Sequence, residues 1–335
     1  MLAKKIGIDL GTSTLRAYVR GAGIVADEPS LLAVDRRRGR VVAVGARALD
    51  ALGRRPDALR AERPVQGGQI VDLVGAGAML DHLIGRAQGG LHLGRPEVMI
   101  CVPYGVSGTG RRALTEAAIR AGSRQAWLLD APLAAAIGAD MPVGDRRGQA
   151  ICDIGGGTAE IAVISLSGLV TSSAVPVGGN RLDQAVVALL ERRHGLLIDE
   201  HAAEDARTRA GAVAPTSGPL RIDVSGKDVA SGASRTLSLE PAEVVEALQE
   251  PLSAIATEIR EVLTQTPPEL VRDIERGGIT LTGGGALLRG LDRYLADRVG
   301  LPTRVAAGAP ACAARGAGLA LDRFEVLRGG NLSLR

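Results

Sequence analysis

The pattern of hydrophobic positions predicts two segments with the same layout. Residues 5–20 read KIGIDLGTSTLRAYVR, and residues 149–165 read QAICDIGGGTAEIAVIS. Each is an apolar run, then Asp-x-Gly, then a turn of small residues, then a second run rich in β-forming residues, which is typical of a tight hairpin. Asp9 and Asp153 hold the same place in the two segments. We therefore predict an internal duplication, with two α/β domains of similar build that face each other.

Outside these hairpins, short apolar runs alternate with longer amphipathic ones, which indicates strands alternating with helices. Strands are predicted at residues 97–102, 126–129 and 279–281. Helices are predicted at residues 110–122, 132–139, 180–194 and 241–263. Residues 142–147 are interpreted as the connection between the halves, and residues 213–219 as a Pro/Ser/Gly-rich loop in a smaller subdomain.

Composition narrows the class of protein. Aromatic residues make up only 1% of the chain, so its core must be built from Val, Leu, Ile and Ala. Only three of the 40 basic residues are lysines, Lys4, Lys5 and Lys227, and the net charge is +3. Arginines are scattered among carboxylates, apart from a run at residues 36–38 that is typical of a solvated turn, so we expect no nucleic-acid partner.

The cysteines and the apolar runs bear on the compartment. Cys101, Cys152 and Cys312 lie far apart in mostly apolar surroundings, which indicates reduced core thiols in a cytosolic protein rather than a metal site or disulfides. Asp9 interrupts the first apolar run, so a signal peptide is not expected. No run approaches the roughly 20 apolar residues of a membrane-spanning helix. Any membrane contact is therefore expected to be peripheral.

Three Gly-rich turns carry the chemistry that the sequence suggests. Residues 11–14 (GTST) and 155–158 (GGGT) are hairpin turns whose backbone N–H groups and hydroxyls suit a polyphosphate. Asp9 and Asp153, just before these turns, would approach a Mg²⁺ from both sides through water. A third turn, residues 282–286 (TGGGA), follows a strand and is expected to open a helix, which suits an α-phosphate or nucleoside. Each turn alone is a weak signal, but three together predict a nucleotide site.

These residues resemble the actin, heat-shock-chaperone and sugar-kinase superfamily, and within it the MreB/Mbl bacterial actins. The resemblance extends over most of the chain. Its motifs are residues 6–14 (IGIDLGTST), 23–30 (GIVADEPS), 100–106 (ICVPYGV), 134–138 (AAAIG), 163–172 (VISLSGLVTS), 266–270 (TPPEL) and 278–290 (GITLTGGGALLRG).

The resemblance implies an actin-like fold: two duplicated α/β domains, each with a smaller subdomain, and an ATP cleft between them. The implied subdomains are IA (residues 1–32, 67–144 and 316–335), IB (33–66), IIA (145–180 and 250–315) and IIB (181–249). It also implies ATP or ADP with Mg²⁺, and head-to-tail filaments of the chain with itself that organise cell shape and cell-wall synthesis. The expected location is the cytoplasm, with peripheral contact to the inner face of the membrane and to cell-wall-synthesis membrane proteins.

Two other classes of the superfamily are alternatives. A sugar or acyl kinase would need a substrate-binding base in the cleft and usually larger inserts, and neither is evident in the sequence. A chaperone-like ATPase would need a peptide-binding domain, for which the residues after the final predicted helix leave little room.

Site residues are carried over by position. The phosphates are expected on Thr12, Ser13, Thr14, Gly155, Gly156, Gly157 and Thr158. The nucleoside is expected on Glu204, Asp205, Ala206 and Arg207, although Glu204 and Arg207 at i, i+3 alone would more often form a surface salt bridge. Gly283, Gly284, Gly285 and Ala286 would close the site. Asp9 and Asp153 would organise Mg²⁺ and the attacking water.

One departure concerns hydrolysis. Where the family has two acidic residues before the Pro of its proline–alanine helix, this chain has Asp130-Ala131-Pro132. The second acid positions the hydrolytic water in the family, and an alanine side chain cannot orient or polarise water. Asp130 could replace it only through a local shift. We therefore expect a slow ATPase at most.

A second departure concerns the membrane. Only five residues precede the first strand, too few for an amphipathic anchor helix, so the loop with Leu91 and Leu93 is the candidate anchor. Burying one leucine is worth about 1.5–3 kcal/mol, and a filament multiplies weak contacts. An ordinary loop with incidental leucines is an equal alternative.

Overall fold

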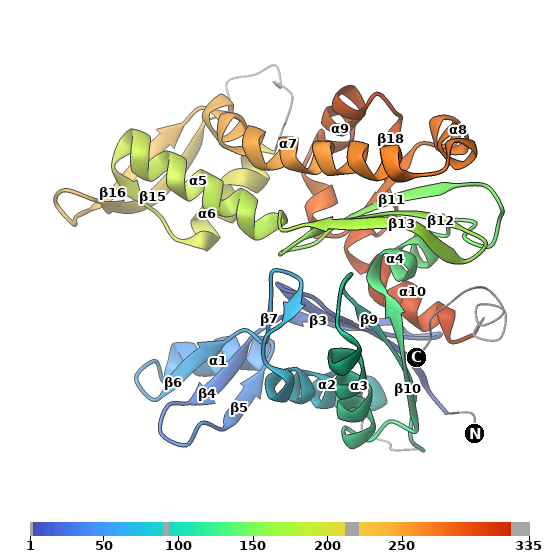
Figure 1. Ribbon diagram of the computed structural model, residues 1–335. Helices are drawn as coiled ribbons and strands as arrows, with labels where there is room; N and C mark the ends of the chain where they lie inside the picture. The colour runs from blue at the N-terminus through green and yellow to red at the C-terminus, as the bar shows by residue number, and fades with distance from the viewer. Residues whose placement is uncertain (1–2, 90–93, 212–220, 323–335) are drawn as a thin grey trace.

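Two five-stranded sheets with the same topology form the centre of the molecule. In the computed structural model, which describes residues 3–89, 94–211 and 221–322, one sheet is ordered β10 (Gln125–Asp130), β9 (Glu97–Val102), β1 (Lys5–Leu10), β2 (Thr14–Val19) and β3 (Gly23–Pro29). The other is ordered β18 (Thr303–Val305), β17 (Ile279–Thr282), β11 (Gln149–Ile154), β12 (Ala159–Ser165) and β13 (Gly168–Val175). In both, the first two pairings are parallel and the last two antiparallel. The predicted duplication is confirmed (Figure 1).

The outer helices of the two halves sit on the far sides of their sheets (Figure 1). In the first half these are α2 (Leu73–Gln88) and α3 (Gly108–Arg120). In the second half they are α7 (Pro241–Gln265), α8 (Pro268–Gly277) and α9 (Leu291–Val299). Each half has its own apolar cluster, built largely from the inward faces of its strands and helices.

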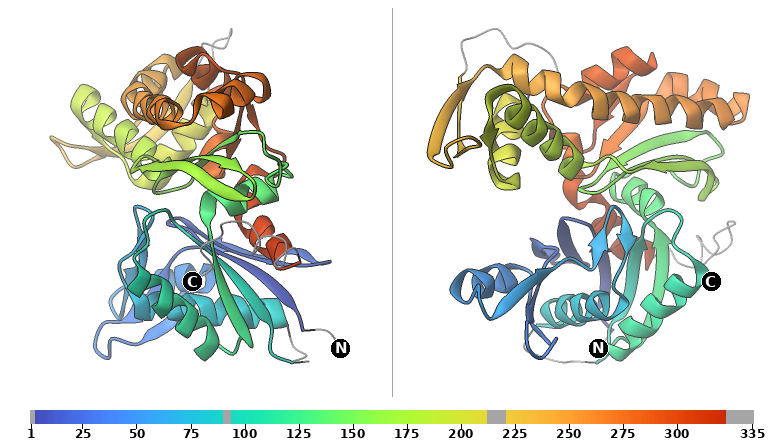
Figure 2. Two further views of the ribbon diagram at one scale, coloured as in Figure 1. Left: turned by 45° about the vertical axis from the view of Figure 1, so that its right-hand side comes forward. Right: turned by 60° about the vertical axis from the view of Figure 1, so that its left-hand side comes forward.

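A pair of helices made of small residues joins the halves (Figure 2). The helix α4 (Ala131–Gly138) follows β10, and α10 (Cys312–Ala320) comes after β18. Each of these strands comes last along the chain in its sheet, so the two helices are equivalent elements of the duplication. A Cβ on Gly138 would lie 1.9 Å from the Cys312 carbonyl oxygen, and one on Gly316 would lie 1.7 Å from the Ala134 carbonyl oxygen. The two backbones therefore approach as closely as they do only because these positions lack side chains.

Two smaller units extend from the sheets. One is the sheet β5 (Val41–Val44), β4 (Leu32–Asp35), β6 (Leu59–Glu62) with α1 (Ala46–Arg54). The other is the sheet β14 (Leu196–Leu197), β15 (Ile222–Asp228), β16 (Ser234–Leu239) with α5 (Gly179–His194) and α6 (Glu200–Ala210). The division into four subdomains stays a prediction. The boundary predicted at 249/250 falls inside α7, and the one at 315/316 falls inside α10.

The predicted elements agree with the structure to within about three residues at each end, and the strand at residues 97–102 has the predicted bounds. The third Gly-rich turn differs in detail, because it opens a single 3-10 turn at Gly284–Leu287, and α9 begins only at Leu291. The predicted loop at residues 213–219 lies outside the described residues.

The cysteines and lysines occupy contrasting places. Cys101, Cys152 and Cys312 are buried free thiols, and burial raises the pKa of each of them. Lys5 begins β1 and Lys4 directly precedes it, whereas Lys227 is exposed on β15. Figure 1 places β15 and the dark-blue start of the first sheet at opposite corners of the molecule. Among the described helices, none combines the length and hydrophobicity needed to cross a membrane.

Candidate functional site

A cavity of about 990 Å³ lies between the two halves, and we call it the cleft. Its lining includes residues of all three Gly-rich turns, both hairpin aspartates, the start of α5 and one face of α6. Residues that are far apart in the sequence therefore meet in the cleft, as we predicted from the duplicated hairpin pattern.

The two hairpin turns have the same backbone geometry. The Gly11 N–H donates to the Thr14 carbonyl oxygen at 3.1 Å, and the Gly155 N–H donates to the Thr158 carbonyl oxygen at 2.8 Å. Each hydrogen bond closes its turn, and residues of both turns line the cleft from opposite halves.

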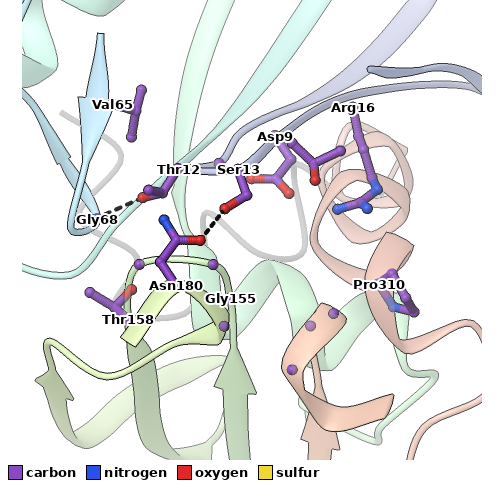
Figure 3. Close-up of a pocket in the computed structure, with 18 of the residues that line it drawn as sticks. Asp9, Thr12, Ser13, Arg16, Val65, Gly68, Gly155, Thr158, Asn180 and Pro310 are labelled. Atoms are coloured by element: carbon purple, nitrogen blue, oxygen red, sulfur yellow. Dashed lines mark hydrogen bonds between the residues drawn. The ribbon is translucent and has the colours of Figure 1, made fainter. Parts of the chain in front are cut away.

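The turns also meet across the cleft. The Ser13 hydroxyl donates to the Asn180 side-chain oxygen, on α5, at 2.9 Å (Figure 3). A Cβ on Gly156 would lie 2.0 Å from the Ser13 hydroxyl oxygen, so the first turn can approach the second only at a glycine.

A third contact comes from the hairpin of β7 (Val65–Gln66) and β8 (Gln69–Ile70). The Gly68 N–H donates to the Thr12 hydroxyl at 3.0 Å (Figure 3). Gly67 and Gly68 have φ of 53° and 72°, which non-glycine residues rarely adopt. This hairpin was not predicted from the sequence. Its signal is a Gly-Gly pair between short β-forming runs, which is typical of a type I′ hairpin.

Two buried carboxylates, Asp9 and Asp153, line the cleft at the strand ends that lead into the turns. Burial raises the pKa of Asp9 to about 6, despite the opposing charge of Arg16, and Asp153 raises it further. Burial also raises the pKa of Asp153, although its Oδ1 accepts a hydrogen bond from the Thr282 hydroxyl at 2.7 Å. Two carboxylates that burial makes costly to ionise are suited to a bound cation.

Glu160 is a further acid of the cleft, which was not predicted from the sequence. It pairs directly with Asp153 in the β11–β12 ladder, lines the cleft, and accepts a hydrogen bond from the Tyr104 N–H at 3.1 Å. Burial, followed by the charge of Asp153, raises the pKa of Glu160 to about 8. Its signal in the sequence is a single acid within an otherwise apolar strand, AEIAVIS.

Comparisons with known proteins place this geometry in a family. The family model for MreB/Mbl protein matches residues 3–329. The chain belongs to the MreB/Mbl family. The cell shape-determining protein MreB of Escherichia coli (strain K12) is 43% identical over 337 residues, which cover 99% of this chain and 97% of that protein. The cell shape-determining protein Mbl of Bacillus subtilis (strain 168) is 40% identical over 98% of both chains.

Solved structures agree on the actin-like fold. MreB 5 of Spiroplasma citri bound to AMPPNP has a TM-score of 0.89 at 31% identity, over 97% of this chain and 98% of that one. The MamK double helical filament has a TM-score of 0.78 at 20% identity, over 96% of this chain and 99% of that one, which bears on the fold alone.

In this MreB/Mbl chain, the predicted nucleoside residues on α6 divide between two faces. Glu204 and Arg207 line the cleft, whereas Asp205 forms an exposed ion pair with Arg209, and Ala206 is buried in the core. Arg207 is 8% exposed, and its Nε donates to Asp183 Oδ1 at 2.6 Å, while its Nη2 lies 3.9 Å from Glu204 Oε1. The surface salt bridge considered from the sequence is thus the weaker of two ion pairs made by a buried arginine.

The third Gly-rich turn reaches the cleft through its glycines. Gly283, Gly284 and Gly285 line the cavity, while Ala286 packs behind them in the core. Gly283 has a φ of 81°, and a Cβ there would lie 2.2 Å from the Ile154 carbonyl oxygen. Glycine therefore lets this turn pack against the end of β11.

The position expected to hold the hydrolytic acid faces the cleft. Ala131 lines the cavity and is 8% exposed. Asp130 occupies the N-cap position of α4, but its carboxylate forms an ion pair with Arg111 on α3 instead of a capping hydrogen bond, and it is not among the residues that line the cleft. The other expected phosphate residues, Thr14, Gly157 and Thr158, all line it. The candidate membrane residues Leu91 and Leu93 lie outside the described residues.

Proposed function

We propose that this chain binds ATP or ADP in the cleft and assembles into cytoskeletal filaments that organise cell shape and cell-wall synthesis. The single observation that carries the nucleotide part is the convergence of three Gly-rich turns on one cavity between the duplicated halves. Structures of the relative from Spiroplasma citri bound to AMPPNP and to ADP support it.

Mg²⁺ is proposed as the companion of the nucleotide. The fit is chemical, because Asp9 and Asp153 offer oxygen ligands, and burial raises the pKa of both. Among the described residues, no cluster of three or more protein ligands is present. Mg²⁺ usually takes one or two carboxylates and completes its shell with phosphate oxygens and water, so two aspartates are sufficient.

Self-assembly is proposed through the smaller units, chiefly residues 33–66 and 181–249. Membership of the MreB/Mbl family supports assembly of the chain with itself. Peripheral contact with the inner face of the cell membrane through Leu91 and Leu93, and with cell-wall-synthesis proteins there, remains part of the proposal.

Hydrolysis is proposed to be slow, with Asp153 near the attacking water. Ala131 brings only a methyl group to the cleft, and the carboxylate of Asp130 is engaged by Arg111. No observation favours a kinase or chaperone-like ATPase over this proposal.

Two measurements test the proposal separately. Calorimetric titration of the purified chain with ATP and with ADP, in Mg²⁺, should give saturable binding, and Asp9→Ala should weaken it. Sedimentation and negative-stain microscopy at micromolar protein with ATP or AMPPNP should give filaments. A chain that binds neither nucleotide contradicts the cleft assignment, and a strictly monomeric chain across salt and nucleotide conditions contradicts assembly.

A further inference from the structure

Arg16 occupies the position in the first hairpin that Glu160 occupies in the second. It pairs directly with Asp9 in the β1–β2 ladder, as Glu160 pairs with Asp153 in the β11–β12 ladder. Directly paired residues of antiparallel strands project on the same face, so both side chains lie beside a cleft aspartate. The duplicated hairpins have therefore placed a cation on one wall of the cleft and an acid on the other.

The guanidinium of Arg16 is largely withdrawn from solvent and incompletely paired. Its side chain is 14% exposed, and it lines the cleft next to Asp9 (Figure 3). The Nε atom is buried and, within the described residues, has no hydrogen-bond partner. Its contact with Asp27 Oδ1, at 3.1 Å, is an ion pair outside hydrogen-bonding geometry, and the Asp27 side chain is 55% exposed. A desolvated arginine with free donors is costly unless an anion completes its shell.

The charge of Arg16 acts on both halves. It opposes the rise in the pKa of Asp9 that burial causes, and it opposes the same rise in the pKa of Asp153 across the cleft. The other arginines of the described lining are placed differently, since Arg207 is bound to Asp183 and Arg63 is exposed. Within the described lining, Arg16 is thus the arginine that pairs directly with a hairpin aspartate, and its side chain is only 14% exposed.

We propose that Arg16 binds a phosphate group of the nucleotide, as a fixed cation beside the phosphate turns. The inference rests on the proposed function and adds a phosphate-binding residue that lies outside the Gly-rich turns. A guanidinium presents five N–H donors in a plane, and the ion pair with Asp27 leaves most of them for phosphate oxygens. Because the lining is otherwise rich in carboxylates, a polyphosphate needs such a charge in addition to a divalent cation.

Calorimetric titration of full-length variants tests this role. The ligands are ATP, ADP and adenosine, each in excess Mg²⁺, and the variants are Arg16→Gln and Arg16→Lys. Loss of a charge-assisted phosphate contact should lower ATP and ADP affinity about ten- to a hundredfold in Arg16→Gln and leave adenosine affinity unchanged. Arg16→Lys, which keeps the charge but not the planar donors, should lose less. Arg20→Gln, at the exposed end of the same strand pair, is the matched control and should bind all three ligands like the wild type.

The outcomes separate this inference from the function on which it rests. Unchanged ATP affinity in both folded variants overturns the inference, as does an equal loss for ATP and adenosine, which would mean that Arg16 only shapes the cleft. If Arg16→Gln does not fold, as judged by circular dichroism, the ratio of ATP to adenosine affinity in Arg16→Lys decides in the same way. Wild-type protein that binds no nucleotide contradicts the proposed function instead.

Discussion

At the scale of single residues, burial of acids in the cleft makes stability depend on pH. Glu160 has a folded-state pKa of about 8 against an ordinary value of 4.5. Because the folded state binds this proton more tightly than the unfolded chain does, the stabilisation is fully present below pH 4.5 and is lost as the pH rises through 8. The unliganded protein should therefore lose stability over this range on account of Glu160.

The variant Glu160→Gln should remove that dependence while keeping an acceptor for the Tyr104 N–H. Relative to wild type, its free energy of unfolding should gain about 2–5 kcal/mol between pH 5 and pH 9. Urea unfolding without nucleotide or Mg²⁺ measures the difference. Glu204→Gln is the control, since that side chain also lines the cleft but is 60% exposed. A constant difference between Glu160→Gln and wild type across pH would contradict the burial argument.

Ala131 is the basis of a second prediction for a single residue, which concerns the rate of phosphate release. A carboxylate there would project into the cleft, where a water-orienting group commonly contributes ~10²–10⁴-fold in rate. Ala131→Glu should raise phosphate release under polymerising conditions without abolishing assembly. Asp130→Asn, compared with wild type, tests the alternative that Asp130 performs this task. If wild type releases phosphate as fast as Ala131→Glu, the interpretation of Ala131 is wrong.

At the scale of elements, the Gly-rich turns differ in how strictly they require glycine. A methyl group on Gly156 would collide with Ser13 and disturb its hydrogen bond to Asn180, whereas one on Gly284 meets nothing within 4 Å. Gly156→Ala should weaken ATP binding about tenfold or more, equivalent to ~1.4 kcal/mol, while Gly284→Ala should not. Gly156→Val should be worse than Gly156→Ala. Calorimetry on this series checks the order, and equal affinities would reject close contact between the turns.

The helix pair α4 and α10 gives a stability prediction. Gly316→Ala puts a methyl group against the Ala134 carbonyl oxygen and should lower the free energy of unfolding by about 1–3 kcal/mol. Gly85→Ala is the matched control, because Gly85 lies within α2 and a Cβ there meets nothing within 4 Å. That variant should be neutral, or more stable by up to about 1 kcal/mol. Chemical denaturation compares the two, and similar values would mean that the helices can move apart at no cost.

Most strands, helices and hairpins could be predicted from the sequence, because the hydrophobic pattern and the Gly-rich turns are local signals. The hairpins at Asp9 and Asp153 are examples, and their shared layout also predicted the repeated sheet. The Gly67–Gly68 hairpin was missed, since its strands are only two residues each. The roles of Arg16 and Glu160 could not be found locally, because both depend on which residue lies opposite in the ladder.

At the scale of the whole molecule, assembly multiplies weak surface contacts. The loop with Leu91 and Leu93 is the predicted anchor, and two leucines per subunit would bind a bilayer weakly unless many subunits are joined. Filaments of wild type should therefore float with liposomes, and the double variant Leu91→Ser/Leu93→Ser should float less. Equal flotation of both proteins, or flotation of neither, would reject the loop as the anchor.

The distribution of lysines has a practical consequence for mapping how subunits join. Lys4 and Lys5 lie at the start of the first sheet, Lys227 lies on β15 at the opposite corner, and the sequence contains no other lysine. Apart from the terminal amine, an amine-reactive cross-linker can therefore anchor at only these two places. A head-to-tail array that brings the corner of one subunit to the base of the next would give a ladder of covalent oligomers, whereas Lys227→Arg would abolish links through that corner without changing its charge.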